Sequence, residues 1–281
     1  MTTNIEQTKV SQHALDQFQA IQNMLKHKKP ILFLDYDGTL TPIVSRPDLA
    51  VLSQQSRQIV EQVAAALPTA IISGRATDDV KNLVKINTIY YAGNHGFDME
   101  GPNLKHQLAS EFIPDVHRVY CRIEEKLKDV PGCIIENKIF SLSVHYRLVE
   151  SEKDEKKIFD TVKAIVEREE RVKLTFGKKV IEVRPRVEWN KGKAVIHLLH
   201  LFQSQLKIED SIPIYIGDDR TDEDAFDAVK SFGIGILVAD NRNDERLNQN
   251  SPNKTNAKFY VNGVDEALKF LLKLSIKPSH V

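Results

Sequence analysis

Cysteine is scarce in this sequence, whose 281 residues include only Cys121 and Cys133. Neither cysteine lies in a C-x-x-C or Cys/His spacing, which argues against a metal-thiolate site and a disulfide framework and predicts two reduced thiols. Long apolar runs are lacking as well, and the first nine residues are polar. We therefore expect no membrane span and a cytoplasmic protein.

Net charge is also absent, because 39 Lys and Arg residues balance 39 Asp and Glu residues. The sequence contains no basic stripe with interleaved aromatic residues, so nucleic acid and anionic membranes are not expected partners. The remaining composition, with 41% hydrophobic and 28% charged residues, is that of an ordinary globular protein. The length allows one large α/β domain or a core domain with a smaller inserted one.

Three short apolar runs end in polar turns that contain glycine. The runs cover 31–34, 69–72 and 214–216, which predicts buried parallel strands. Helical patterns alternate with these strands and lie at 14–25, 54–66, 191–201, 222–230 and 264–274. This alternation predicts an α/β fold with a Rossmann-like parallel-sheet core, which binds ligands at the carboxyl ends of its strands.

The middle of the chain follows a different pattern, in which a helix and a pair of strands occur twice. In order, the predicted elements are helix 111–128, strands 133–140 and 141–147, helix 152–168, and strands 172–176 and 180–184. The segment 177–179 suits a tight hairpin turn. This pattern predicts an inserted α+β domain at 107–186, flanked by core segments 1–106 and 187–281.

Two aspartates follow the first buried strand, in the sequence Asp35-Tyr36-Asp37-Gly38-Thr39-Leu40. An Asp-Gly pair is a common turn signal, so a purely structural turn is the alternative. The sequence resembles the first motif of the haloacid dehalogenase superfamily of phosphotransferases. That resemblance implies that Asp35 is a nucleophile that forms an acyl phosphate. It also implies that Asp37 is the acid for the leaving alkoxide and the base for the attacking water.

The second and third motifs of the superfamily have counterparts in this chain. Ser73 resembles the second motif, whose hydroxyl suits phosphate oxygens, although a serine at a strand-to-helix turn is more often a cap. The third motif is a lysine that counters charge on the nucleophile and the phosphate. The segment 190–194 resembles it, with Lys191 as the better match and Lys193 as the alternative.

An acidic cluster at 217–224 follows the third buried strand and resembles the fourth motif. Thr221 and Asp224 fit a helix N-cap, so Asp224 is interpreted as structural. Asp218 and Asp222 are left for chemistry.

Mg²⁺ is the expected cofactor, because it binds oxygen ligands through one or two carboxylates plus substrate phosphate. The expected ligands are Asp35, the backbone carbonyl of Asp37, and Asp218. Asp222 would then orient Lys191 or a metal-bound water.

Five segments resemble trehalose-6-phosphate phosphatases, and the resemblance spans residues 31–272. The segments are 93–96, 143–147, 182–185, 190–192 and 217–223. The insertion lies between the second and third motifs, which is the position of a cap domain, and its doubled pattern resembles the larger cap of sugar phosphatases. The resemblance implies removal of phosphate from trehalose 6-phosphate, so the expected partner is a small-molecule sugar phosphate.

Strand alternation predicts one polar face in the insertion, because Ser143, His145 and Arg147 share one side of a strand. A solvated sheet face is the alternative. With the resemblance added, we expect this face to bind sugar. The expected sugar-binding residues are Glu136, Arg147, Lys178 and Glu182 from the insertion, with Arg75, Asn94 and His95 from the core. A lone histidine is commonly structural, which is the alternative for His95.

Two other interpretations stay open. The same fold could act on sucrose phosphate or a hexose phosphate, or the chain could be a catalytically silent sugar-phosphate sensor. The intact set of Asp35, Asp37, Lys191 and Asp218 argues against the sensor. The sequence does not define the oligomeric state.

Overall fold

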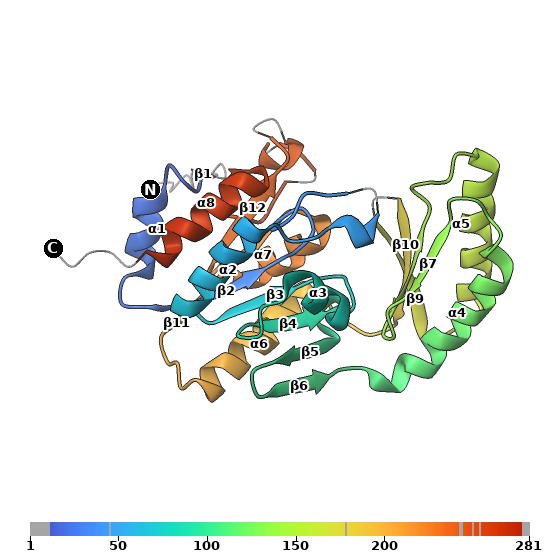
Figure 1. Ribbon diagram of the computed structural model, residues 1–281, viewed down its shortest axis with the longest axis horizontal. Helices are drawn as coiled ribbons and strands as arrows, with labels where there is room; N and C mark the ends of the chain where they lie inside the picture. Colours follow the sequence, from blue (N-terminus) through green and yellow to red (C-terminus); the bar gives the residue numbers. More distant parts are fainter. Residues whose placement is uncertain are drawn as a thin grey trace, which may run out of the picture.

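The computed structural model describes residues 12–276, except positions 45, 178, 242, 243, 249 and 253. Two sheets organise this part of the chain (Figure 1). The larger sheet lies within an α/β core, and the smaller sheet stands beside it with two helices on its outer face. The predicted α/β class is confirmed.

The core sheet has nine strands in the order β1-β13-β12-β11-β2-β3-β4-β5-β6. They are β1 (Gln12–His13), β2 (Lys29–Leu34), β3 (Thr69–Ile72), β4 (Tyr90–Gly93), β5 (Asp98–Gly101), β6 (Leu104–Gln107), β11 (Ser211–Gly217), β12 (Ile234–Ala239) and β13 (Phe259–Asn262). Pairing is parallel from β1 to β4 and antiparallel for β5 and β6. The strands predicted from their polar ends, β11, β2 and β3, are neighbours. We call their carboxyl ends the core edge.

Helices bury both faces of the core sheet, and the alternation along β2 shows why its sequence is apolar throughout. Leu32 and Leu34 pack on one side, and Ile31 and Phe33 pack on the other. The first side carries α1 (Phe18–Leu25), α2 (Gln54–Ala66), α3 (Thr77–Val84) and α8 (Gly263–Ser275), and the second carries α6 (Lys191–Gln205) and α7 (Glu223–Val229). A strand covered on both sides needs an apolar residue at every position.

The helix predicted at 222–230 has a different start in the structure. A short 3₁₀ helix, Arg220–Asp222, precedes α7, and its N-cap is Asp219. Asp219 and Asp222 each accept a backbone N–H of the other, which forms a capping box. The predicted N-cap role of Thr221 and Asp224 is therefore wrong.

The smaller sheet has four antiparallel strands in the order β7-β8-β10-β9. Its strands are β7 (Ile134–Asn137), β8 (Leu142–His145), β9 (Val172–Gly177) and β10 (Val180–Pro185). The apolar face is buried under α4 (Ile113–Leu127) and α5 (Glu152–Val166). We call the unit from α4 to β10 the cap. Within it, a helix followed by a pair of strands occurs twice, as the sequence predicts.

Six strands of the core sheet have no counterpart in the sequence prediction: β1, β4, β5, β6, β12 and β13. Five of them contain four residues or fewer, which is too short a run to show a clear alternation. The sixth, β12, is a six-residue apolar run that the prediction missed. The remaining short elements are 3₁₀ helices at Pro47–Leu49, Asn94–Gly96, Ser110–Phe112 and Glu245–Leu247. Among the residues described, no helix combines the length and apolar character needed to cross a membrane.

Candidate active site

The chain turns sharply after β2, and a glycine makes this turn. Asp35 directly follows β2, is almost fully buried, and donates its N–H to the carbonyl of Ile216 at 2.9 Å. Gly38 has a φ of +81°, and a Cβ atom on it would lie 2.1 Å from Oδ2 of Asp218. Only glycine fits both conditions. The loop that carries Asp35 and Asp37 therefore packs directly against Asp218.

Lys191 lies at the start of α6 and is buried against two carboxylates. Its Nζ donates to Oδ1 of Asp35 at 2.8 Å and to Oδ1 of Asp222 at 2.7 Å. The helix begins here because the side chain of Asn190 accepts the N–H of Lys193 and caps the first turn.

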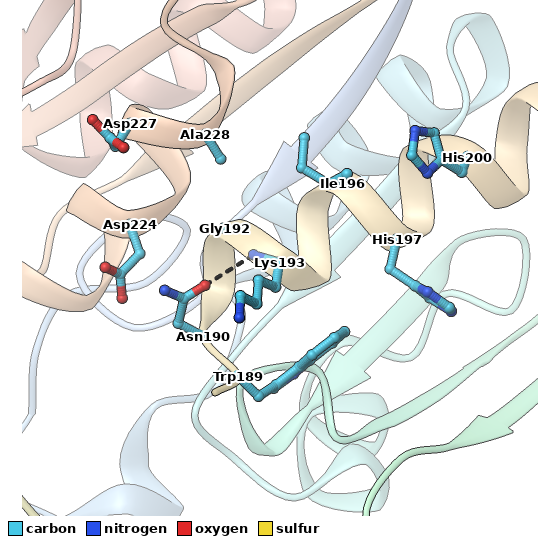
Figure 2. Close-up of a pocket in the computed structure, with 10 residues that line it drawn as sticks. All are labelled: Trp189, Asn190, Gly192, Lys193, Ile196, His197, His200, Asp224, Asp227 and Ala228. Carbon is cyan, nitrogen blue, oxygen red and sulfur yellow. Dashed lines mark hydrogen bonds between the residues drawn. The ribbon is translucent and has the colours of Figure 1, made fainter. Parts of the chain in front are cut away.

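Lys193, the alternative lysine, faces a different part of the surface. Figure 2 shows it among the residues that line a pocket of about 450 Å³ between α6 and α7. Its Nζ donates to the carbonyl of Glu188 at 2.6 Å. Neither Asp35 nor Asp218 lines this pocket, so the structure places Lys191, and not Lys193, against Asp35.

Close packing of α6 on α7 fixes Lys191 relative to Asp222. A Cβ atom on Gly192 would lie 2.3 Å from the carbonyl oxygen of Asp224. The two helices therefore meet backbone to backbone in the first turn of α6. Any larger side chain at Gly192 would force them apart.

Asp222 is held by hydrogen bonds on both of its oxygens. Oδ1 accepts the hydroxyl of Tyr215 at 2.6 Å as well as Nζ of Lys191, and Oδ2 accepts the N–H of Asp219 at 2.8 Å. No role for Tyr215 was predicted from the sequence. The only feature that points to one is its hydroxyl group within the apolar run of β11. These bonds suit a residue that orients Lys191.

Three carboxylates at the core edge form a site that could hold a metal ion. Asp35, Asp218 and Asp222 each offer one oxygen, and these oxygens all lie within 4.8 Å of one another. Burial, reinforced by repulsion among the three, raises the pKa of Asp35 and the pKa of Asp218. Lys191 opposes both shifts, but one cation does not balance three carboxylates. Clustered oxygen donors with surplus negative charge fit a divalent cation.

Ser73 follows β3 at the same edge of the sheet. β2 and β3 pair in parallel with Leu34 opposite Ile71, so Ser73 and Asp35 both follow the carboxyl ends of adjacent strands. Oγ of Ser73 accepts the N–H of Arg75 at 3.1 Å. The hydroxyl therefore stabilises its own turn in addition to its position at the core edge.

Arg75 is bound by carboxylates of the core. Nε and Nη2 donate to the two carboxylate oxygens of Asp37 at 2.7 and 2.8 Å, and Nη1 donates to Asp79 at 2.7 Å. Asp79 was also missed in the sequence, where its only signal is the spacing of four residues from Arg75. The structure thus brings Arg75 to Asp37 rather than to the polar face of the cap.

The polar face of the cap points toward the core edge. We call it the polar cap face, and its members are Glu136, Lys138, Ser143, His145, Glu182 and Arg184. Strand pairing places Glu136, Ser143 and Glu182 in one row. Nε2 of His145 lies 2.9 Å from Oε2 of Glu136, and Nζ of Lys138 lies 3.7 Å from Glu136 and 3.8 Å from Glu182.

Hydrogen bonds join the polar cap face to the core. Nζ of Lys138 donates to the carbonyl of Gly74 at 3.0 Å, and the carbonyl of Lys138 accepts Nδ2 of Asn94 at 3.0 Å. The hydroxyl of Ser141 donates to Oδ1 of Asn94 at 2.7 Å. Asn94 and His95 have φ values of 51° and 57°, in the left-handed region that non-glycine residues seldom occupy. Asn94 and His95, both predicted to bind sugar, lie at the boundary between core and cap, because Asn94 bonds to Lys138 and Ser141 and His95 lies near Glu182.

His95 is buried at this boundary. Its Nε2 contacts the guanidinium of Arg184 and lies 3.7 Å from Oε2 of Glu182. Burial, together with the nearby Arg184 charge, lowers the pKa of His95 to about 4. The imidazole is therefore neutral near pH 7, and Nε2 can accept a hydrogen bond from Arg184.

Arg147 is predicted to bind sugar, but the structure does not place it with this group. Arg147 is exposed and lies beyond the end of β8. Lys178 lies outside the described residues.

The chain is similar in sequence to proteins of one enzyme family. Residues 33–265 match the model of the family described as trehalose-phosphatase. The probable trehalose-phosphate phosphatase 4 of Oryza sativa subsp. japonica is 43% identical over 268 residues, which cover 93% of this chain and 70% of that protein. Trehalose-phosphate phosphatase B of Arabidopsis thaliana is 41% identical over 274 residues, with the same two coverages.

Solved structures with the same fold include two with related titles. A trehalose-6-phosphate phosphatase related protein has a TM-score of 0.71 at 25% identity, covering 87% of this chain and 96% of that one. The C-terminal domain of trehalose-6-phosphate phosphatase from C. albicans has a TM-score of 0.71 at 24% identity. The match covers 95% of this chain and 99% of that one. The second likeness concerns the fold alone.

These comparisons confirm the resemblance that the sequence motifs predict. The family consists of phosphoric monoester hydrolases of the haloacid dehalogenase type, which implies a divalent metal, and the acidic trio at the core edge could bind one. The chain belongs to the trehalose-phosphatase family.

Proposed function

We propose that this protein hydrolyses trehalose 6-phosphate to trehalose and phosphate, with Asp35 as the nucleophile and Mg²⁺ as the cofactor. The observation that carries the proposal is the buried contact between Lys191 and Asp35 at the core edge, in a chain of this family. A carboxylate is a weak nucleophile, and it attacks phosphorus only where nearby positive charge offsets the charge of the phosphate.

The proposed metal ligands are Asp35, the backbone carbonyl of Asp37, and Asp218. Their oxygen atoms suit Mg²⁺, which would neutralise charge on the phosphate when bound. Asp222 is proposed to orient Lys191, since its two oxygens already accept bonds from Lys191, Tyr215 and Asp219.

In the first proposed step, a carboxylate oxygen of Asp35 bonds to phosphorus while the bond from phosphorus to the sugar oxygen breaks. Asp37 gives its proton to that oxygen, so trehalose leaves as a neutral alcohol. In the second step, Asp37 takes a proton from water, and the water oxygen attacks phosphorus and releases phosphate from Asp35. Lys191 and Ser73 are proposed to hold the phosphate oxygens and counter their charge.

The cap is proposed to select the sugar. We propose that residues 107–186 form the cap domain, between core segments 1–106 and 187–281. The proposed sugar contacts are Glu136, Arg147, Lys178 and Glu182 from the cap and Asn94 and His95 from the boundary. The row of Glu136, Ser143 and Glu182 supports this role, because it presents side chains able to bond sugar hydroxyls toward the core edge.

Sucrose phosphate and hexose phosphates are the alternative substrates, and a catalytically silent sensor is the alternative function. Both are less well supported than trehalose 6-phosphate, because curated relatives at 43% and 41% identity carry trehalose-phosphate phosphatase names. The proposed location is the cytoplasm, and the free thiols of Cys121 and Cys133 agree with a reducing compartment.

The test is phosphate release by the purified protein from trehalose, sucrose and hexose phosphates, each with and without Mg²⁺. We expect the highest kcat/KM for trehalose 6-phosphate and no turnover after chelation with EDTA. A higher kcat/KM for another sugar phosphate would replace the substrate. No turnover with any phosphate ester would support the sensor.

A further inference from the structure

Arg75 lies beside the proposed acid and base of the reaction and makes all of its described bonds within the core. We propose that Arg75 is a positioning residue that sets the orientation of Asp37 for proton transfer, and that Asp79 holds Arg75 in place. This inference rests on the proposed function, because it concerns the same two steps. It differs from the sequence prediction, in which Arg75 contacts the substrate.

The contact between Arg75 and Asp37 is a two-point contact. Nε donates to Oδ2 of Asp37 at 2.7 Å, and Nη2 donates to Oδ1 at 2.8 Å. A guanidinium and a carboxylate joined through two parallel bonds lie in a fixed relative orientation. The pair therefore fixes the plane of the Asp37 carboxylate.

The other side of the guanidinium is bound as well. Nη1 donates to Oδ2 of Asp79 at 2.7 Å, and Nη2 also donates to the carbonyl of Pro47 at 2.9 Å. All three guanidinium nitrogen atoms thus have acceptors, and the four bonds use four of the five N–H groups. To turn away from the core toward a sugar phosphate, the guanidinium would have to break charge-assisted bonds that are each stronger than an ordinary hydrogen bond.

Packing around Arg75 adds a further restraint. Its side chain is only 8% exposed, and its guanidinium lies 5.6 Å from the ring centroid of Tyr36. The hydroxyl of Tyr36 donates to the carbonyl of Ala50 at 2.6 Å. The segment 47–50 therefore binds both Arg75, through the carbonyl of Pro47, and Tyr36, through the carbonyl of Ala50.

Asp37 needs such a restraint more than Asp35 does. The side chain of Asp37 is 39% exposed, whereas that of Asp35 is 6% exposed and is bound by Lys191. A catalytic group that transfers a proton must stay within hydrogen-bond reach of the reacting oxygen. The side chain that fixes Asp37 in the described structure is Arg75.

Asp79 restrains Arg75 from the first turn of α3. It lies four residues after Arg75, so the two side chains meet on one face of the chain as it enters the helix. Asp79 therefore positions Arg75, and Arg75 in turn positions Asp37. A loss at Asp79 should have the same effect as a loss at Arg75, but a smaller one.

The test is a double-mutant cycle measured by phosphate release from trehalose 6-phosphate and from p-nitrophenyl phosphate. Arg75→Ala and Asp37→Ala should each lower kcat on the sugar phosphate by about 10²-fold or more. The double variant should be no more than about threefold slower than Asp37→Ala, because Arg75 has no function once its partner is absent. Losses that multiply would overturn the proposal.

Binding of phosphate separates positioning from direct contact. In Arg75→Ala, the inhibition constant for inorganic phosphate and the KM should stay within about twofold of wild type while kcat falls. A rise of about tenfold in either constant would show that Arg75 binds the substrate phosphate, and would overturn the proposal.

Asp79→Asn provides a milder variant if Arg75→Ala does not fold, as judged by thermal unfolding. We expect a loss in kcat of about fivefold to tenfold, and no further loss in the Asp37→Ala background. The matched control is Lys81→Gln, on the same helix, which breaks a 2.6 Å ion pair with Glu100 outside this group. A rate for Asp79→Asn equal to that of the control would overturn the role of Asp79.

The two substrates keep this test separate from the proposed substrate. If p-nitrophenyl phosphate is hydrolysed and trehalose 6-phosphate is not, the proposed substrate is wrong, but the cycle can still be measured. If the wild-type protein hydrolyses both and the losses multiply, only the positioning role is wrong.

Discussion

The core edge and the polar cap face both gather charged side chains, but they hold them differently. At the core edge, Lys191 lies 2.7 and 2.8 Å from its two carboxylates and is almost fully buried. On the polar cap face, Lys138 lies 3.7 and 3.8 Å from Glu136 and Glu182. Charge-assisted hydrogen bonds are about 2.7–2.9 Å long, so Lys138 makes ion pairs but no hydrogen bond with either glutamate.

The difference indicates separate tasks for the two regions. Chemistry at Asp35 requires a fixed geometry, and the core edge supplies it through short bonds and close backbone contacts. Recognition of a sugar requires hydrogen-bonding capacity that a ligand can take up. Lys138 makes no hydrogen bond with Glu136 or Glu182, although His145 contacts Oε2 of Glu136 at 2.9 Å and Nε of Arg184 donates to Oε2 of Glu182 at 2.9 Å. The other oxygen of each carboxylate keeps acceptor capacity that a ligand can use.

The largest expected effect would come from the nucleophile itself. Asp35→Asn removes the oxygen that bonds phosphorus, so phosphate release should fall by at least about 10⁴-fold. The substitution also removes one charge from three mutually repelling carboxylates, so the midpoint of thermal unfolding should not decrease. Appreciable activity in this variant would show that the core edge is not the site of chemistry.

Removal of metal is the next largest test of the core edge. EDTA should abolish phosphate release, and added Mg²⁺ should restore it, because the acidic trio has surplus negative charge. Asp218→Ala should need at least about tenfold more Mg²⁺ for half-maximal activity, or remain inactive. Full activity after thorough chelation would contradict the metal site.

The polar cap face should show a smaller effect that depends on the substrate. Glu182→Gln should lower kcat/KM for trehalose 6-phosphate by about 10- to 100-fold, because binding energy from the remote sugar is lost. With p-nitrophenyl phosphate the loss should be less than about threefold.

Glu167→Gln is the matched control for Glu182→Gln, since Glu167 pairs with Lys163 at 3.8 Å on the exposed side of the cap. It should behave as wild type on both substrates. Equal losses on both substrates for Glu182→Gln would remove the distinction between the two regions.

The smallest expected effect concerns the boundary, where His95 has a pKa of about 4. The unfolded chain protonates this histidine near pH 6.5, but the folded protein resists protonation because burial and Arg184 disfavour the charged form. The contribution of His95 to the free energy of unfolding should therefore fall by about 2 kcal/mol as the pH drops from 7 to 5. The raised pKa values of Asp35 and Asp218 act in the opposite direction over the same interval.

Urea unfolding of the protein and of His95→Gln at both pH values isolates this contribution. His95→Gln should lose less stability than the wild type over the same interval. Equal losses would show that His95 titrates normally. Glu182 and Lys191 also act on His95 through their charges, with opposite signs, so the difference between the two proteins is the informative quantity.

Much of this arrangement could be predicted from local sequence. The helix at 54–66 is present with the predicted bounds, and its start is marked by Ser53, whose side chain accepts the N–H of Ser56. The strand ends that carry Asp35 and Ser73 follow from short apolar runs with polar turns. The alternation that places Glu182 on the polar cap face is equally local, because side chains in a strand alternate between two faces.

Other features could not be predicted because they join distant parts of the chain. Arg75 and Asp37 are 38 residues apart, and no periodicity links them. Tyr215 occupies a position in an apolar strand that an aliphatic residue would also fill, and its bond to Asp222 depends on the turn that follows. The N-cap at Asp219 was missed because several acidic residues in the cluster fit a capping pattern equally well.

The approach of α6 to α7 at Gly192 has a consequence for protein engineering. Replacing a helical glycine with alanine is a standard way to raise thermal stability, because alanine favours the helix and restricts the unfolded chain. Here the added methyl group would lie 2.3 Å from the Asp224 carbonyl oxygen and would push the first turn of α6 away from α7. Lys191 and Asp222 would separate, and the overpacked contact would also lower the stability. The general preference for alanine over glycine in helices therefore fails at this position for both stability and turnover.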